Sequence, residues 1–157
     1  MRTSRFIIIV SLCIAGIYGA NCPDGFEGHH GTCYFFSHGK ETWQGAYDSC
    51  KDIIGASLVE VTSDDENNYL SRKSAVLDHS FWIGLTDKMF EGEFVWETST
   101  DLLSGTGYWG LNEPDSDPSN NCVRYGTSHQ NLWSDSDCND HYYYICEKSD
   151  GAMQVIG

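Results

Sequence analysis

The cysteines constrain the fold of this chain more than any other feature of its sequence. The chain has seven. Cys13 lies in an apolar run, residues 6–17, that follows a short basic start and precedes small residues, a pattern typical of a secretory signal peptide. We expect residues 1–20 to be removed and the mature protein to be secreted. The remaining cysteines are even in number, which in an exported chain indicates disulfide bonds, but the sequence alone does not fix their pairing. They are Cys22, Cys33, Cys50, Cys122, Cys138 and Cys146.

The charge of the chain excludes one class of partner. Nine basic residues stand against 23 acidic ones, which gives a net charge of −14. A chain this acidic has no electrostatic attraction to phosphate backbones or to anionic lipid, so nucleic acid is excluded as a main partner. Divalent cations are the natural counter-charge. The apolar leader is too short for a membrane helix, and no later stretch is apolar enough to span a membrane.

Two helices are predicted from the sequence. Apolar residues recur at helical spacing along one face of residues 41–54, and Gly55 ends this segment. Ser63 begins the second helix with a capping box. In that arrangement we expect the Ser63 hydroxyl to accept a hydrogen bond from the amide of Glu66, while the Glu66 carboxylate reaches back to the Ser63 amide.

The other segments predict a hairpin and several short strands. Residues 22–35 form the hairpin, with His29 and His30 at its tip. Adjacent histidines can bind metal, but we interpret these two as solvated loop residues. The predicted strands are residues 58–61, 81–85, 94–96, 122–125 and 142–145. The pattern is that of one α+β domain, residues 22–147, followed by a flexible tail, residues 148–157.

Residues 113–138 concentrate carboxylates around a single strongly basic residue, Arg124. Carboxylates this close repel one another, which costs stability unless solvent separates them or a cation lies among them. A bound divalent cation is therefore the expected counter-charge of this segment.

The order of these features resembles the C-type lectin-like domain family over residues 22–147. The motifs that carry the resemblance are residues 82–85 (WIGL), 113–115 (EPD), 133–135 (WSD) and 145–147 (ICE), placed among the six cysteines. The resemblance implies an α+β fold with two helices, small antiparallel sheets and a long loop region pinned by disulfides. It also implies the pairings Cys22–Cys33, Cys50–Cys146 and Cys122–Cys138.

The same resemblance implies a calcium site that also binds sugar. Calcium prefers six to eight oxygen ligands. The implied ligands are Glu113, Asp115, Asn120, Ser134 and Asp135. Of these, Glu113, Asp115, Ser134 and Asp135 would also hydrogen-bond the sugar hydroxyls, and the bond before Pro114 is expected to be cis. Ser134 replaces the usual asparagine and Asn120 a usual glutamate, so we expect weaker calcium binding than the full family pattern gives.

A second, auxiliary calcium site is partly present. The positions that match the family at this site are Asp87 and Glu91, with Asp117 as a further candidate. Asn121 stands where the family usually has an aspartate, which removes one charge from the site.

Enzymatic activity is not expected. Ser128 and His129 are adjacent, but they lack the strand-to-helix turn that exposes a catalytic nucleophile. The sequence has no metalloprotease motif and no phosphate-binding loop motif. Glu113 and Asp115 could imitate the paired acids of a glycosidase, yet two residues apart and beside a predicted calcium they serve better as ligands.

The functional prediction is therefore a secreted lectin with Ca²⁺ as cofactor and glycans as partners, in innate-immune or other glycan recognition. It would recognise vicinal hydroxyls of mannose-type or galactose-type sugars. In the family, Glu-Pro-Asn is typical of mannose binders and Gln-Pro-Asp of galactose binders, so residues 113–115 combine the two. The alternative is a C-type lectin-like protein that needs no calcium and binds protein, ice or mineral.

Overall fold

The computed structural model describes residues 22–115 and 117–151. The predicted signal peptide lies outside the described residues, as do positions 152–157 of the predicted tail. Within the described part of the chain, no helix has the length and apolar character needed to cross a bilayer.

Within the described residues, eight strands pair into one connected set. They are β1 (Glu27–His29), β2 (Thr32–Phe36), β3 (Ser57–Leu58), β4 (Phe81–Thr86), β5 (Val95–Trp96), β6 (Cys122–Gly126), β7 (Leu132–Ser136) and β8 (Tyr143–Ser149). The order is β1-β2-β8-β4-β6-β7, with β3 added to β8 and β5 added to β4. All pairs are antiparallel except β4 with β8, which is parallel. β8 continues to Ser149, two residues into the segment expected to be a flexible tail.

Helix α1 (Trp43–Lys51) is shorter than the predicted segment 41–54. Thr42 caps its start, because its side chain accepts a hydrogen bond from the Gly45 amide at 3.1 Å. Ile54, the last residue of the predicted segment, lies beyond the helix and is 90% exposed, so its inclusion in the predicted apolar face is wrong. Because α1 ends at Lys51, the helical spacing that would direct Ile54 toward the core does not continue to that residue.

Helix α2 (Asp64–Leu77) begins at the predicted cap, but one of the two cap hydrogen bonds is different. The Ser63 hydroxyl accepts from the Glu66 amide at 3.3 Å, as expected. The Glu66 carboxylate instead accepts from the Thr62 amide at 2.8 Å and from the Tyr34 hydroxyl at 2.7 Å. Glu66 is buried, and the contact with Tyr34 of β2 pulls its side chain one residue further back than a capping box requires.

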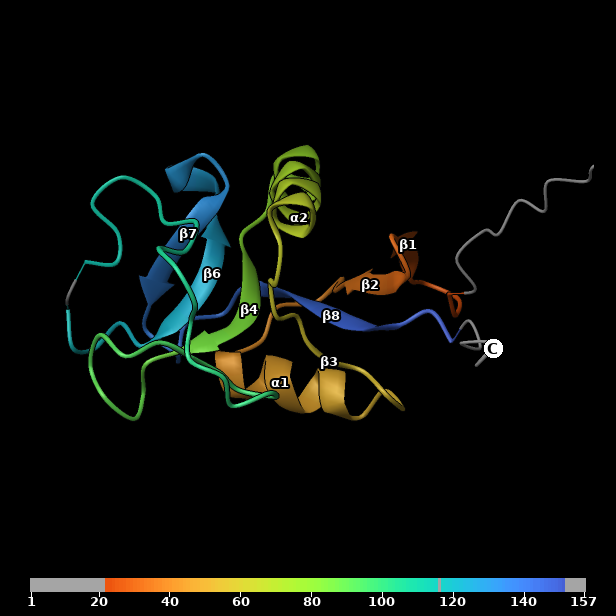
Figure 1. Ribbon diagram of the computed structural model, residues 1–157, viewed down its shortest axis with the longest axis horizontal. Coiled ribbons are helices and arrows are strands. Elements are labelled where there is room, and N and C mark those ends of the chain that lie inside the picture. Colours follow the sequence, from red (N-terminus) through yellow and green to blue (C-terminus); the bar gives the residue numbers. More distant parts are fainter. Residues whose placement is uncertain (1–21, 116, 152–157) are drawn as a thin grey trace, which may run out of the picture.

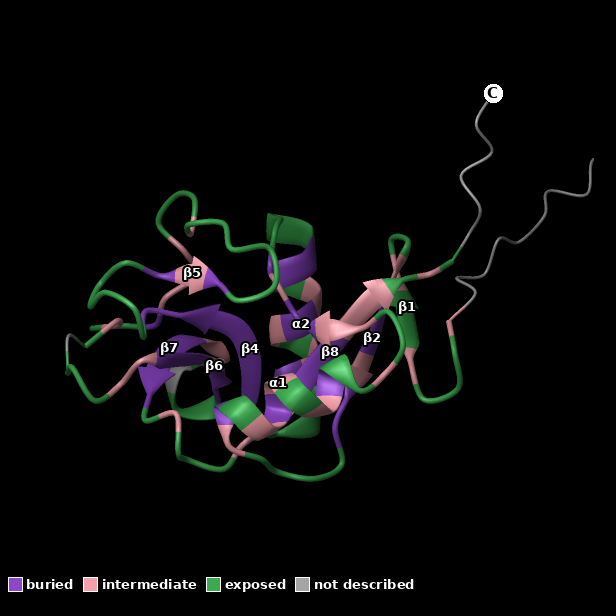
Figure 2. Ribbon diagram, turned by 90° about the horizontal axis from the view of Figure 1, so that it is seen from below, coloured by how far each residue is buried: buried purple, intermediate pink, exposed green. Residues whose placement is uncertain are grey.

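The core lies on both faces of β4, which is buried along its length (Figure 2). Side chains alternate between the two faces of a strand. Phe81, Ile83 and Leu85 join the apolar cluster that includes Leu70 of α2. Trp82 joins the cluster that includes Trp43 of α1. The helices therefore lie on opposite sides of β4, as Figure 1 shows.

Three disulfide bonds tie these layers together, and the predicted pairings are confirmed. Cys22–Cys33 joins the chain before β1 to β2, and Cys50–Cys146 joins α1 to β8. Cys122–Cys138 joins the start of β6 to the turn that follows β7. The third bond fixes the strand pair that carries the acidic segment.

Candidate functional site

The predicted ligand carboxylates gather at the β7 end of the sheet, near the loop that precedes β6. Figure 1 shows this loop on the side of the molecule opposite to β1 and β2. The set is named here the acidic cluster: Asp87, Glu91, Glu113, Asp115, Asp117 and Asp135. It combines residues from the two calcium sites that the sequence predicted separately.

Asp135 is the buried centre of the acidic cluster, with 6% of its surface exposed. It lies on β7, a strand that sequence analysis did not predict. Its carboxylate accepts a hydrogen bond from the Asp115 amide at 3.3 Å. Burial first, then a hydrogen bond with Glu113 and the charge of Asp115, raise the pKa of Asp135 to about 7. Burial and the neighbouring carboxylates thus favour the protonated form of Asp135 when no cation is bound.

Asp115 is held in place by its own loop. The Asn120 side-chain amide donates to one of its carboxylate oxygens at 3.1 Å, and the Asp117 amide donates to the other at 2.9 Å. The Glu113–Pro114 peptide bond is cis, as predicted. Asn120 thus orients one of the predicted ligand carboxylates.

The residues of the predicted auxiliary site belong to the same neighbourhood. Asp87 is 2% exposed; its Oδ2 accepts from the Gly92 amide at 2.8 Å, whereas its buried Oδ1 has no hydrogen-bond partner. Desolvation raises the pKa of Glu91, and so do the charges of the surrounding carboxylates, Asp87, Asp135, Asp117 and Asp115. The two predicted groups of ligands therefore interact as one set of like charges.

Asn121 connects the loop to β4 through its main chain. Its carbonyl oxygen accepts from the Thr86 hydroxyl at 2.7 Å and from the Asp87 amide at 3.2 Å. Its side-chain nitrogen donates to the carbonyl of Pro118 at 2.8 Å. Asn121 thus fixes the loop beside Asp87, while its side-chain oxygen takes no part in these bonds.

Ser134 is placed differently from Asp135. It is fully buried, and its hydroxyl has no hydrogen-bond partner. On β7 it pairs with Arg124, whereas Asp135 pairs with Val123. Because neighbouring side chains of a strand point to opposite faces, the pleat directs Ser134 away from the face that Asp135 occupies.

Arg124 is engaged elsewhere. Its Nε donates to the Ser136 hydroxyl at 2.8 Å, and its guanidinium lies 4.5 Å from the ring centre of Tyr142. Arg124, the one strongly basic residue of segment 113–138, therefore packs against Tyr142 and Ser136.

The chemistry of the cluster fits a hard divalent cation. Glu113, Asp115 and Asp135 offer carboxylate oxygens, which calcium prefers. Asp87 adds a buried oxygen that lacks a partner. Asp115 is exposed, so a ligand from solvent can reach the cluster.

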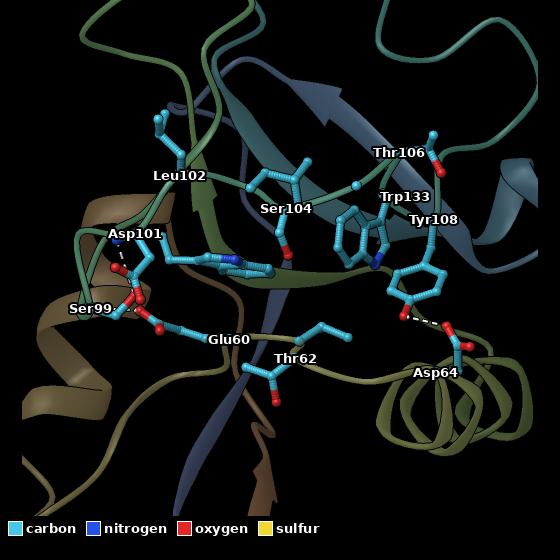
Figure 3. A pocket seen from close by; sticks show the side chains of 15 residues that line it. Glu60, Thr62, Asp64, Ser99, Asp101, Leu102, Ser104, Thr106, Tyr108 and Trp133 are labelled. Atoms are coloured by element: carbon cyan, nitrogen blue, oxygen red, sulfur yellow. Dashed lines mark hydrogen bonds between the residues drawn. The ribbon is translucent and has the colours of Figure 1, made fainter.

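A large cavity lies on another part of the molecule. It has a volume of about 680 Å³, and none of the predicted site residues lines it. Figure 3 shows Trp133 and Tyr108 along one wall, where the Tyr108 hydroxyl donates to Asp64 of α2 at 2.7 Å. The loop of residues 101–108 forms much of the rest. Sequence analysis gave no sign of this cavity.

Sequence comparison with known proteins matches this chain to C-type lectin domains. The family described as lectin C-type domain matches residues 39–148. The chain is 33% identical over 139 residues to C-type lectin domain family 7 member A of Bos taurus, covering 88% of the chain and 55% of that protein. It is 33% identical to the CD209 antigen of Homo sapiens, covering 82% of the chain and 31% of that protein. The chain thus spans between about a third and about half of the length of these relatives.

Solved structures show the same fold. The carbohydrate-recognition domain of the mouse scavenger receptor C-type lectin has a TM-score of 0.76 and 30% identity, covering 84% of this chain and 99% of that one. A calcium-independent type II antifreeze protein has a TM-score of 0.70 and 24% identity, covering 82% of this chain and 94% of that one, a likeness that concerns the fold alone.

Proposed function

Because the chain belongs to the C-type lectin domain family, we propose that it is a carbohydrate-binding protein that depends on calcium held by the acidic cluster. The proposal includes secretion, for which the basic-then-apolar leader and the disulfide bonds are the support. It assigns a binding role without catalysis, as is general in this family, and a place in glycan recognition such as innate immunity.

The observation that carries the proposal is the convergence of carboxylates around Asp135. Burial and the neighbouring Glu113 and Asp115 raise the pKa of Asp135 to about 7. Ionisation of Asp135 in the metal-free fold therefore costs free energy. A divalent cation among these oxygens would remove that cost, because an opposite charge favours the ionised form of each acid.

Calcium, when bound, supplies coordination of two neighbouring sugar hydroxyls. The residues proposed to hold it are Glu113, Asp115, Asn120 and Asp135, and Asp87, Glu91 and Asp117 are the candidates for an auxiliary ion. Glu113 and Asp115 can each accept a hydrogen bond from a sugar hydroxyl with an oxygen not used for the metal, and charge-assisted bonds of this kind are strong. Asn120 keeps Asp115 oriented through its 3.1 Å bond.

The test is binding of the purified chain to immobilised mannose and galactose. Calcium should be required, chelator should release the protein, and Asp135→Asn should lower binding at least about tenfold, because loss of one charge-assisted contact is worth 1.4 kcal/mol or more. Asp24→Asn is the matched control, since Asp24 is an exposed aspartate far from the acidic cluster in sequence and should leave binding unchanged.

Two results would contradict the proposal. Sugar binding that persists in chelator would separate glycan recognition from calcium. A folded protein that binds neither sugar, with or without calcium, would favour the calcium-independent binding of protein, ice or mineral.

A further inference from the structure

A second group of metal-ligating side chains lies at the hairpin formed by β1 and β2. His29 Nε2 and His30 Nδ1 are each 2.8 Å from the same oxygen, Oδ2 of Asp65. These three atoms all lie within 4.8 Å of one another. The histidines come from the hairpin tip and the aspartate from the first turn of α2, 36 residues from His29. The expectation that the histidines are simply solvated is therefore incomplete.

The hairpin turn explains why adjacent side chains converge. His30 and Gly31 both have positive φ angles, 46° and 87°. This is the conformation of the tightest two-residue hairpin turns, so His30 lies outside the strands and the alternation of strand side chains does not extend to it. As a result the rings of His29 and His30 stack with their centres 4.3 Å apart.

The position of His29 is fixed from its other side as well. Its ring stacks on Tyr69 of α2 with the centres 4.2 Å apart. The Tyr69 hydroxyl donates to Glu27 of β1 at 3.3 Å, and Lys73 of α2 forms an ion pair with the same carboxylate. His29 is thus held between His30 and Tyr69, and only 22% of its side chain is exposed. A ligand atom held in this way is available to a metal without further ordering of its side chain.

The surroundings favour a cation and leave it accessible. The three side chains border a cavity of about 340 Å³ that is also lined by the carboxylates of Glu60 and Glu66. The side chain of His30 is 75% exposed and that of Asp65 is 58% exposed. A metal bound here would have an open position facing solvent.

We propose that His29, His30 and Asp65 form a binding site for a borderline divalent transition metal such as Zn²⁺, separate from the acidic cluster. Two imidazole nitrogens and one carboxylate oxygen are a ligand set that zinc accepts, usually with water in the fourth position. Zinc bonds of about 2.0–2.2 Å would require the nitrogen–oxygen separations to widen from 2.8 Å to about 3.3 Å. The exposed side chain of His30 can make that adjustment.

The ligand types separate this site from the proposed calcium site. Calcium prefers six to eight oxygens, whereas zinc favours nitrogen ligands and a coordination number of four. The hairpin group has two nitrogens and the acidic cluster has oxygens alone. Zinc bound at the hairpin would join it to α2 and so stabilise the contact between these two elements.

The test is a calorimetric titration of the full chain with ZnCl₂, using protein purified without a polyhistidine tag. Millimolar CaCl₂ in the buffer keeps the acidic cluster occupied by its preferred ion. We expect one zinc ion per chain in the wild type. His29→Phe, which keeps the stacking on Tyr69, and Asp65→Asn should each weaken binding at least tenfold.

Two further variants make the result specific. His30→Asn should also weaken zinc binding at least tenfold, because asparagine suits the positive φ of this turn but carries no imidazole. His141→Asn removes an exposed histidine outside the group and should leave zinc binding unchanged. Circular dichroism confirms that each variant is folded.

The proposal is overturned if wild-type protein takes up no zinc at about 100 µM. It is equally overturned if His29→Phe and His30→Asn bind zinc as the wild type does. Zinc binding that disappears in Asp135→Asn but not in the hairpin variants would assign the metal to the acidic cluster instead.

Discussion

Asp135 couples the stability of the metal-free protein to pH. Its pKa of about 7 in the fold lies above the value of roughly 3.9 of an unfolded aspartate. Between these values the folded state binds more protons than the unfolded state, so the contribution of Asp135 to stability is full below about pH 4 and is lost as the pH rises through about 7.

We therefore predict that, in chelator, the wild type loses stability relative to Asp135→Asn as the pH rises from about 5 to about 8. Urea unfolding midpoints of both proteins measure this. Glu147, whose pKa burial raises to about 8, shifts both proteins in the same direction and does not affect the difference. Midpoints that run parallel over this range would show that Asp135 is ionised in the metal-free fold.

Residues 113–115 set the prediction for sugar preference. Glu113 and Asp115 are both hydrogen-bond acceptors, and the nearby amide of Asn120 already donates to Asp115. A site without a free amide donor cannot reject a sugar by leaving that donor unpaired. We predict weak binding to both mannose-type and galactose-type sugars, with less than about a hundredfold preference for either.

Glu113→Gln supplies an amide donor and should shift the mannose-to-galactose ratio toward galactose by about tenfold, the value of one good hydrogen bond. Competition with the two monosaccharides at saturating calcium measures the ratio. Glu93→Gln, which changes an exposed glutamate outside the acidic cluster, should leave it unchanged. A strong preference in the wild type would mean that residues beyond this motif determine specificity.

At the residue scale, the sequence predicted local backbone features better than it predicted the hydrogen-bond partners of side chains. The cis bond before Pro114 was predicted and is present. The second cap bond of Glu66 was assigned to Ser63 and goes to Thr62, because Tyr34 competes for the same carboxylate. A local motif cannot show a partner 32 residues away, and for the same reason the pairing of His29 with Asp65 was not foreseen.

At the scale of elements, the missed strand is β7. Its five residues, LWSDS, begin with two apolar residues and continue with three polar ones, so they lack the alternation that marks a half-buried strand. β7 forms because β6 pairs with it along its whole length and Cys122–Cys138 ties the two together. By contrast β4, a continuous apolar run, was predicted almost to the residue.

β4 also gives a prediction about packing. A Cβ at Gly84 would lie 3.0 Å from the carbonyl oxygen of Leu58 and 3.1 Å from that of Val59. Main-chain atoms in a buried layer cannot move aside easily, so Gly84→Ala should cost about 1–3 kcal/mol of unfolding free energy. Gly39→Ala, with open space at the same position, should stay within about 0.5 kcal/mol. Denaturant unfolding of the wild type and both variants measures these differences. Equal midpoints for the wild type and Gly84→Ala would mean that the chain around Leu58 and Val59 moves away from β4 without a cost in free energy.

At the scale of the whole molecule, calcium should stabilise the fold. An ion that binds only the native state at about a hundred times its dissociation constant adds about 2.7 kcal/mol, which corresponds to a rise of several degrees in Tm. Melting curves with calcium and with chelator measure the shift. Asp135→Asn should reduce it strongly, whereas superimposable wild-type curves at millimolar calcium would contradict binding at the acidic cluster.

The order of the strands has a consequence for how this domain can be displayed. Cys22 is bonded to Cys33, and the Asp150 amide donates to the Gly31 carbonyl at 3.0 Å, so both described ends of the chain are fastened to the hairpin. The acidic cluster lies at the opposite end of the sheet order, beside β7 (Figure 1). A tether attached at either end would therefore leave the acidic cluster facing outward. If the acidic cluster binds sugar as proposed, several tethered copies would engage a dense glycan surface together, with an avidity about a hundredfold or more above the affinity of one copy.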